Sequence, residues 1–191
     1  DMTGGSRLGQ TDEVRALVDF LETIYMPDDP LPLLAYLRGD WVGLGDDDLY
    51  AFKRAGGAFD WTVSLPNGLD DSLREKLDVA FGRIYETADA LNMLMPAAAI
   101  ERCLDKLGLM AFVRALPMGA TRSGNLLRVL ALIRQWQSEG MHWGQVVTEL
   151  RAMIDDAEYK VEQMTLASGQ TNVVRLMNLH QSKGLQGKVV F

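Results

Sequence analysis

Apolar residues recur at steps of three and four positions through most of this chain, from about residue 11 to residue 154. Because an α-helix has about 3.6 residues per turn, this spacing places them on one helix face and predicts a set of amphipathic helices packed together. Proline, glycine and acidic helix-start signals divide the series into segments. The expected helices cover residues 11–25, 31–37, 70–91, 96–107, 122–136 and 143–154, with a further short helix capped by Asp46 and a loop at 58–68.

The apolar faces of these helices define a candidate core. In the first helix the face carries Val14, Leu17, Val18, Leu21, Ile24 and Tyr25. In the long helix it carries Leu73, Leu77, Phe81, Ile84, Tyr85, Ala88 and Leu91. Four tryptophans, Trp41, Trp61, Trp136 and Trp143, stand at apolar or helical spacing, which favours core anchors over base-stacking platforms. Met93, Met95 and Met110 are expected to fill gaps in the core rather than bind a partner.

The pattern changes after about residue 156. Residues 157–172 contain little apolar material and are expected to form a connector. Residues 173–191 are rich in β-branched and apolar positions around a polar centre, which predicts a strand, a loop and a second strand. The expected fold class is therefore mostly α, a helical bundle with a short β segment at the C-terminus. A strand pair this short is not stable alone, so it either docks on the bundle or joins a sheet whose other strands lie elsewhere.

The composition fits a globular domain rather than a dedicated nucleic-acid module. The 191 residues are 48% hydrophobic, and their formal net charge is -7 with a pI of about 4.8. Only residues 121–191 carry more Lys and Arg than Asp and Glu. The longest apolar run, 93–100, is far shorter than the roughly 20 residues that span a bilayer, and no signal peptide precedes the first helix. We therefore expect a cytoplasmic protein without membrane contact. Because the last residues stand inside a predicted strand, we also expect a piece of a longer protein.

The common catalytic and metal-binding signatures are absent from the sequence. It contains no GxxxxGK[ST] phosphate loop, HExxH, paired CxxC or GxSxG, so we expect no catalytic residue and no metal site in this chain. The acidic run 46–48 is interpreted as a helix start, since three consecutive residues point in different directions. Cys103 lies in a helical apolar pattern and is expected to be a buried, inert thiol rather than a nucleophile. Arg122, Arg128 and Arg134 are expected to lie on a solvated face rather than in a DNA-binding stripe.

Residues 173–191 hold the most specific pattern in the chain, VVRLMNLHQSKGLQGKVVF. Its polar centre offers side-chain donors and backbone N–H groups between two apolar segments, an arrangement that suits phosphate contacts. By this argument alone, an ordinary connecting loop and a phosphate-binding loop both remain open.

This segment resembles motif V of the superfamily-one DNA helicases of the UvrD/Rep type. His180 and the run Lys183–Leu185 stand at the family's spacing between two apolar strands, the second ending in Val-Val-Phe. Residues 4–15 and 28–49 are similar to the family's stretch after motif IV and to the beginning of its inserted subdomain 2B. The order of these segments along the chain is most similar to the RecB/AddA helicase-exonuclease branch. Residues 122–127 also resemble a helix of that branch.

The resemblance implies a division of the chain and a function. Residues 1–30 would lead from motor domain 2A into the first helix, and residues 31–156 would form the helical 2B subdomain. Residues 157–172 would connect it to residues 173–191, the motif V strand–loop–strand of the RecA-like motor domain 2A. The whole protein would be an ATP-dependent DNA helicase or translocase in DNA repair and recombination, using ATP and Mg²⁺. Its implied partners are single- and double-stranded DNA and a second protein of a helicase–nuclease complex. This chain alone is expected to bind no cofactor and to be inactive.

The resemblance also assigns site residues in the polar loop. Asn178, His180 and Ser182 would contact DNA, and Lys183, Gly184 and Gln186 would lie on the ATP side. Three positions depart from the family pattern: Asn178 replaces Thr, Gln186 replaces the Glu that binds the ATP ribose, and Gly187 replaces Phe.

Two alternatives stay open at this point. One is a non-catalytic helical scaffold belonging to a degenerate helicase-like protein. The other is an unrelated helical protein, in which residues 173–191 would form a docked hairpin.

Overall fold

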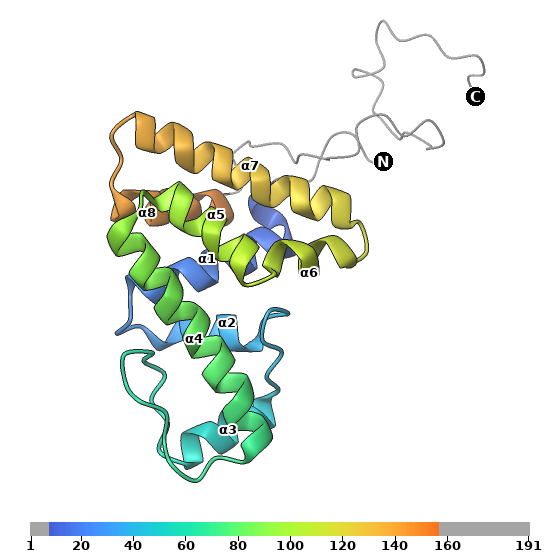
Figure 1. Ribbon diagram of the computed structural model, residues 1–191, viewed down its shortest axis with the longest axis vertical. Helices are drawn as coiled ribbons and strands as arrows, with labels where there is room; N and C mark the ends of the chain where they lie inside the picture. The colour runs from blue at the N-terminus through green and yellow to red at the C-terminus, as the bar shows by residue number, and fades with distance from the viewer. Residues whose placement is uncertain (1–7, 157–191) are drawn as a thin grey trace, which may run out of the picture.

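The computed structural model describes residues 8–156, and this part of the chain is helical (Figure 1). A 3-10 turn η1 (Leu8–Gln10) is followed by α1 (Asp12–Tyr25), α2 (Pro30–Arg38), α3 (Asp46–Arg54), α4 (Asp71–Met93), α5 (Pro96–Lys106), α6 (Leu109–Ala115), α7 (Gly119–Ser138) and α8 (Trp143–Asp155). The mostly α fold class is confirmed. The connector at 157–172 and the β segment at 173–191 lie outside the described residues.

Local capping explains why most helix starts could be predicted. The Asp70 carboxylate accepts hydrogen bonds from the N–H groups of Ser72 and Leu73, which begins α4. The Asp29 carboxylate accepts from the Leu31 N–H in the same way at the start of α2. Pro96 occupies the first turn of α5, where the missing N–H costs nothing. Each capping signal acts within one helical turn, so it can be recognised from neighbouring residues in the sequence.

Three local features differ from expectation. The N-cap of α3 is Gly45 rather than Asp46, and the Asp48 carboxylate accepts from the Gly45 N–H at 3.2 Å. The acidic run still lies in the first turn, which confirms that it marks a helix start. Helix α6 was not predicted, because seven residues are too few to show a helical period. Helix α7 begins at Gly119, before the expected residue 122, and the tight α6–α7 turn requires glycine at that position because a Cβ would overlap the Arg114 carbonyl.

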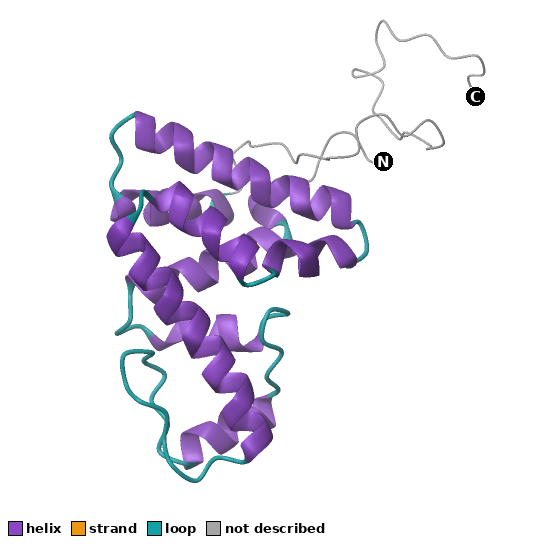
Figure 2. Cartoon of the chain, in the orientation of Figure 1, coloured by secondary structure: helices purple, strands orange, loops and turns teal. Residues whose placement is uncertain are grey.

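Helix α1 lies at the centre of the packing. It contacts α2, α4, α7 and α8, while α4 runs between the part that contains α3 and the part that contains α5 (Figures 1 and 2). On its apolar face Phe20 is fully buried, with its ring 5.0 Å from Tyr36 and 6.0 Å from Trp41. The buried side chains form one continuous core. None of the described helices is both long and apolar enough to cross a membrane.

Most of the candidate core residues are buried, but some are not. Trp41 and Trp136 are buried and the other two tryptophans are packed against the core, which confirms their interpretation as anchors. Tyr25 and Tyr85 are 43% and 44% exposed, because each lies at the edge of its helix face. The interpretation of Met93 and Met95 as gap fillers is wrong. They flank the turn between α4 and α5, where their side chains face solvent.

The long connection between α3 and α4 is fastened by an aromatic pair. The Trp61 indole N–H donates to the Thr23 carbonyl at 2.7 Å, and the Tyr85 hydroxyl donates to the Trp61 carbonyl at 2.7 Å. The two rings lie edge to face, with centroids 5.3 Å apart. These contacts fasten the loop to the last part of α1 and to α4, even though its own sequence predicts only turns; Figure 2 shows its course as a loop.

Buried carboxylates on α1 bind α7 and α8. Glu13 and Glu22 are each 5% exposed. The Asn125 amide and the Arg122 guanidinium, both on α7, donate to Glu13 at 2.7 and 3.1 Å. Arg151 on α8 donates to Glu22. Because every partner is supplied by another helix, these bonds set the register of α1 against its neighbours.

The same contacts correct one expectation about the arginines. The Arg122 side chain is only 25% exposed and pairs with Asp12 and Glu13, so its assignment to a solvated face is wrong. Arg128 and Arg134 are exposed, as expected, and Arg134 pairs with Glu101 on the surface.

Removing the Arg151 guanidinium should destabilise the fold strongly. In Arg151→Met, Glu22 is left as a buried carboxylate without its cation, and we expect a loss of about 3 kcal/mol in the free energy of unfolding. Arg134→Met is the matched control, because its partner Glu101 is half exposed and the expected loss is under about 1 kcal/mol. Urea unfolding followed by circular dichroism measures both.

A double variant separates a lost charge partner from lost packing. Glu22→Leu combined with Arg151→Met removes both charges, and it should recover most of the stability lost in Arg151→Met. Equal stability of Arg151→Met and Arg134→Met would contradict the structural role given to the Glu22–Arg151 pair.

Candidate functional site

The residues that the helicase resemblance assigns to DNA and ATP lie outside the described residues. These are Asn178, His180 and Ser182 on the DNA side and Lys183, Gly184 and Gln186 on the ATP side. Their roles stay predictions. The described part of the chain contributes a different site, a cleft on the surface of the helical body.

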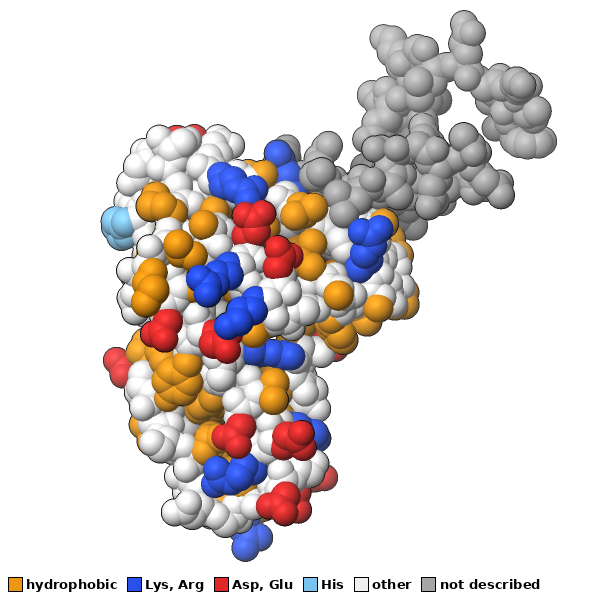
Figure 3. Space-filling view, in the orientation of Figure 1, with side chains coloured by type: hydrophobic (Ala, Val, Ile, Leu, Met, Phe, Trp, Pro, Cys, Tyr) orange, Lys and Arg blue, Asp and Glu red, His pale blue; other side chains and the backbone are white. Residues whose placement is uncertain are grey.

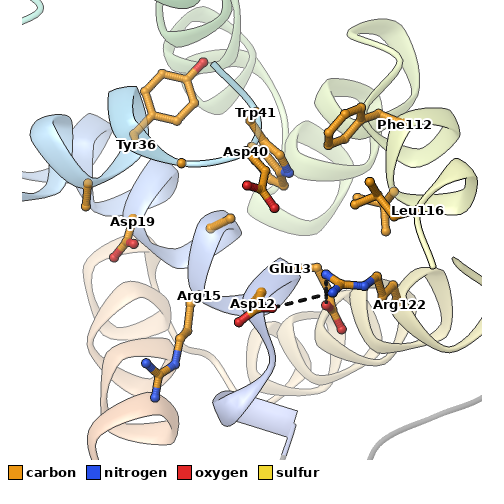
Figure 4. A pocket seen from close by; sticks show the side chains of 14 residues that line it. Asp12, Glu13, Arg15, Asp19, Tyr36, Asp40, Trp41, Phe112, Leu116 and Arg122 are labelled. Carbon is orange, nitrogen blue, oxygen red and sulfur yellow. Dashed lines mark hydrogen bonds and ion pairs between the residues drawn. The ribbon is translucent and has the colours of Figure 1, made fainter. Parts of the chain in front are cut away.

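The cleft lies between α1, the turn that follows α2, and the segment that joins α6 to α7 (Figure 4). Its volume is about 310 Å³, at the small end of the range for ligand sites. Trp41, Phe112 and Leu116 form an apolar wall, and the small side chains Ala16 and Ala35 also line it. Phe112 is 38% exposed.

Acidic side chains line the cleft beside this apolar wall. Asp12, Asp19 and Asp40 all contribute, and the Asp40 carboxylate faces the open centre below Trp41 (Figure 4). Asp40 is exposed, and it makes no hydrogen bond or ion pair with any of the described residues. Asp12 and Glu13 already hold Arg122. The cleft therefore carries negative charge that its own arginines do not fully neutralise.

The two arginines at the cleft do not offset this charge equally. Arg122 is bound by Glu13 at 3.1 Å and by Asp12 at 3.5 Å. The Arg15 side chain points away from the centre, and its guanidinium donates to the Gln10 side chain at 2.6 Å (Figure 4).

Burial raises the pKa of Asp19, and a hydrogen bond from Arg151 opposes that rise.

Sequence reasoning missed this cleft, because three distant segments build it. They are residues 12–19, 35–41 and 112–122, and no local motif joins them. The sequence does contain one partial signal, an aspartate directly after the glycine that ends α2 and directly before a tryptophan. This signal gains meaning only when α6 and α7 fold against α1.

Cys103 lies on α5 and is buried where this helix packs against α4, as the sequence predicted. The Thr87 hydroxyl donates to its sulfur at 3.1 Å, and the thiol is 6% exposed. Burial raises the pKa of Cys103 to about 11, while the Thr87 hydrogen bond and Arg83 act in the opposite direction. A protonated, enclosed thiol is a poor nucleophile. Within residues 8–156 no three His, Cys, Asp or Glu side chains are grouped as a metal site would require.

The surface shown in Figure 3 mixes both signs of charge. Arg134 pairs with Glu101 at 2.6 Å, and Lys106 pairs with Glu86 at 2.8 Å. On this face, Lys and Arg side chains are interspersed with Asp and Glu rather than gathered into a continuous basic track. Non-specific binding to a DNA backbone depends on such a track, so this face is not built for it.

Comparison with known proteins finds relatives whose similarity covers nearly the whole chain. It is 28% identical over 189 residues to AddA, the ATP-dependent helicase/nuclease protein of Bacillus cereus strain G9842, covering 94% of this chain and 15% of the relative. The AddA proteins from Exiguobacterium sibiricum and Pelotomaculum thermopropionicum are each 26% identical, covering 97% and 95% of this chain. They are covered over only 16% and 15% of their own length. No family model matches the chain.

These relatives confirm the resemblance to the RecB/AddA-like branch of helicases. The similarity extends through the helical part of the chain and is not confined to residues 173–191. It therefore contradicts the alternative of an unrelated helical protein in which the Lys-Gly-Leu run is a coincidence. The chain spans about 15% of the length of the curated relatives that it matches.

The environment of Cys103 predicts low reactivity and a specific pH dependence. At about pH 8, iodoacetamide should alkylate the folded chain about a hundredfold more slowly than the urea-unfolded chain, because a higher pKa leaves less thiolate and burial blocks access. Mass spectrometry over time measures both rates. Equal rates would contradict the buried, protonated thiol.

The sign of the pH effect follows from the two states of the thiol. The unfolded thiol ionises near its ordinary pKa of 9.0, whereas the folded one stays protonated to about 11. The folded state therefore holds more protons in this window, and stability falls as the pH rises. The stability advantage of the wild type over Cys103→Ala should shrink across the same window.

Proposed function

We propose that this chain is the helical insertion and the motif V region of an ATP-dependent DNA helicase–nuclease that acts in DNA repair and recombination. One observation carries the proposal. Similarity to AddA-type helicase/nuclease proteins covers 94% to 97% of the chain in three relatives, and the same chain holds His180 and Lys183–Leu185 at the helicase spacing. In the whole protein, ATP and Mg²⁺ would drive movement along DNA.

The proposed division assigns residues 31–156 to subdomain 2B and residues 173–191 to motor domain 2A. Residues 1–30 lead into the subdomain, and residues 157–172 lead back to the motor. Packing among the described helices supports a body that moves as one unit, because buried ion pairs and one continuous core join them. The packed body also includes helix α1, which the proposed division places in the entry segment 1–30 and which packs at the centre of the body.

The motif V loop has the chemistry to couple ATP to single-stranded DNA. Asn178, His180 and Ser182 carry hydrogen-bonding groups that suit phosphate and sugar contacts. Lys183 and Gly184 would face the nucleotide. The Lys183 ammonium would bind phosphate, and Gly184, which has no side chain, would let the backbone come close to the nucleotide. Gln186 would accept a hydrogen bond from the ribose, but without the charge-assisted strength of a carboxylate.

The helical body would contribute contacts to duplex DNA or to a partner protein. The mixed charge on the face shown in Figure 3 favours a few local contacts over a continuous electrostatic track. Binding through such a body would therefore depend on shape and on individual side chains.

A second candidate function is a non-catalytic scaffold in a degenerate helicase-like protein. The observation that favours it is the set of three departures from the motif pattern at Asn178, Gln186 and Gly187. The two functions differ in a simple respect. A working motor hydrolyses ATP when single-stranded DNA is added, and a scaffold does not.

His180→Ala in the full-length protein should weaken single-stranded DNA binding about tenfold, because a hydrogen bond to a charged phosphate is lost. Fluorescence anisotropy with a labelled oligonucleotide and DNA-stimulated ATPase assays measure the effect. His142→Ala is the matched control, since this exposed histidine lies in the helical body. If both variants bind DNA equally, His180 does not contact it.

Gln186→Glu in the full-length protein should lower the KM for ATP about threefold to tenfold, because a carboxylate accepts the ribose hydrogen bond more strongly. Steady-state ATPase kinetics give the KM. An unchanged KM would show that position 186 does not contact the ribose. No hydrolysis by the wild-type full-length protein would favour the scaffold, and hydrolysis by residues 1–191 alone would contradict the proposed division of labour.

A further inference from the structure

We propose that the cleft between α1, the turn after α2 and the α6–α7 segment receives an arginine or lysine side chain from a partner polypeptide. The proposal extends the partner-binding role suggested for the helical body. Only the identity of the partner rests on that proposed function. The cleft itself is formed by residues far along the chain from the motif V loop.

The shape of the cleft matches a long side chain with an apolar stem. Trp41, Phe112 and Leu116 provide an apolar wall, and the volume of about 310 Å³ is small. The exposed part of Phe112 would lose contact with water when a stem lies against it. The partly exposed ring of Phe112 also favours a cation, because aromatic ring faces attract positive charge.

The charges select a cation over an anion. Asp40 makes no hydrogen bond or ion pair with the described residues, and its carboxylate faces the centre of the cleft (Figure 4). Arg122 is already held by Asp12 and Glu13, and Arg15 points away. A DNA phosphate would meet net repulsion here, which makes a protein the partner that the chemistry fits.

Arginine fits better than lysine. Its planar guanidinium stacks on aromatic rings and donates to a carboxylate in a fixed geometry, whereas an ammonium is a compact and strongly hydrated charge. The partner segment would thus present one basic side chain as an anchor, with weaker contacts around it. A single buried anchor of this kind is how many interfaces obtain their affinity.

The test uses the purified 191-residue chain and N-acetyl-arginine amide as the probe. The indole resonance of Trp41 is assigned by Trp41→Phe and followed by NMR during a titration. We expect a saturable shift with a midpoint of about a few millimolar, which is typical for one isolated side chain. The matching citrulline compound is neutral and nearly isosteric, and it should cause a much smaller shift.

Two variants locate the effect. Asp40→Asn should weaken the binding of the probe about fivefold, because it removes the charge that faces the cleft. Asp78→Asn is the matched control, since this exposed aspartate on α4 lies outside the cleft. Circular dichroism melting shows that each variant is folded. Phe112→Ala should also weaken binding while leaving Asp40 in place.

The outcomes separate this proposal from the helicase assignment. No saturable shift, an equal shift with citrulline, or equal binding by Asp40→Asn and Asp78→Asn would each overturn the cleft proposal. Binding of a single-stranded oligonucleotide at Trp41 in preference to the arginine probe would overturn it as well. ATPase activity of the full-length Asp40→Asn protein should be unchanged, so failure of the cleft leaves the proposed helicase function standing.

Discussion

The burial of charged groups on α1 is the constraint on which the rest of the described structure depends. This helix places an apolar face in the core and also buries Glu13 and Glu22, whose carboxylates need partners that α1 itself does not supply. Arg122 and Arg151, on α7 and α8, meet that need. The last helices of the described chain therefore pack against the first one, and the core closes around α1 from both sides.

The cleft is a consequence of the same arrangement. Binding of Arg122 by Glu13 holds the start of α7 against α1, and the short α6 that precedes it then adds Phe112 to the apolar wall that contains Trp41. Carboxylates and guanidinium groups that pair with each other inside the fold cannot pair with a partner at the surface. The acids that remain open toward solvent, Asp40 above all, give this region its negative character. A body that is acidic here and mixed in charge on the face of Figure 3 suits selective contacts better than general attraction to DNA.

Local physics explains which elements could be predicted. The start of α4 at Asp70 and the start of α5 at Pro96 depend on side chains within one turn, so the sequence alone locates them. Helix α6 has too few residues to display a period, and the turn at Gly119 depends on close approach to another backbone segment. The residues assigned to motif V were predicted through a resemblance, and they lie outside the described residues. The cleft had no sequence signal beyond the aspartate before Trp41, because its walls come from three separated segments.

By itself, the sequence determined the mostly α class, the approximate limits of the long helices and the likeness to RecB/AddA-type helicases. These depend on periodicity, on capping within a turn and on a motif of adjacent residues, all of which are properties of neighbours along the chain. Only the tertiary structure decided that Glu13 and Glu22 are buried, that Arg122 is a structural partner and that Asp40 faces a cleft. The two buried pairs join groups more than a hundred residues apart, because the partner of a buried charge is chosen by packing and not by sequence distance.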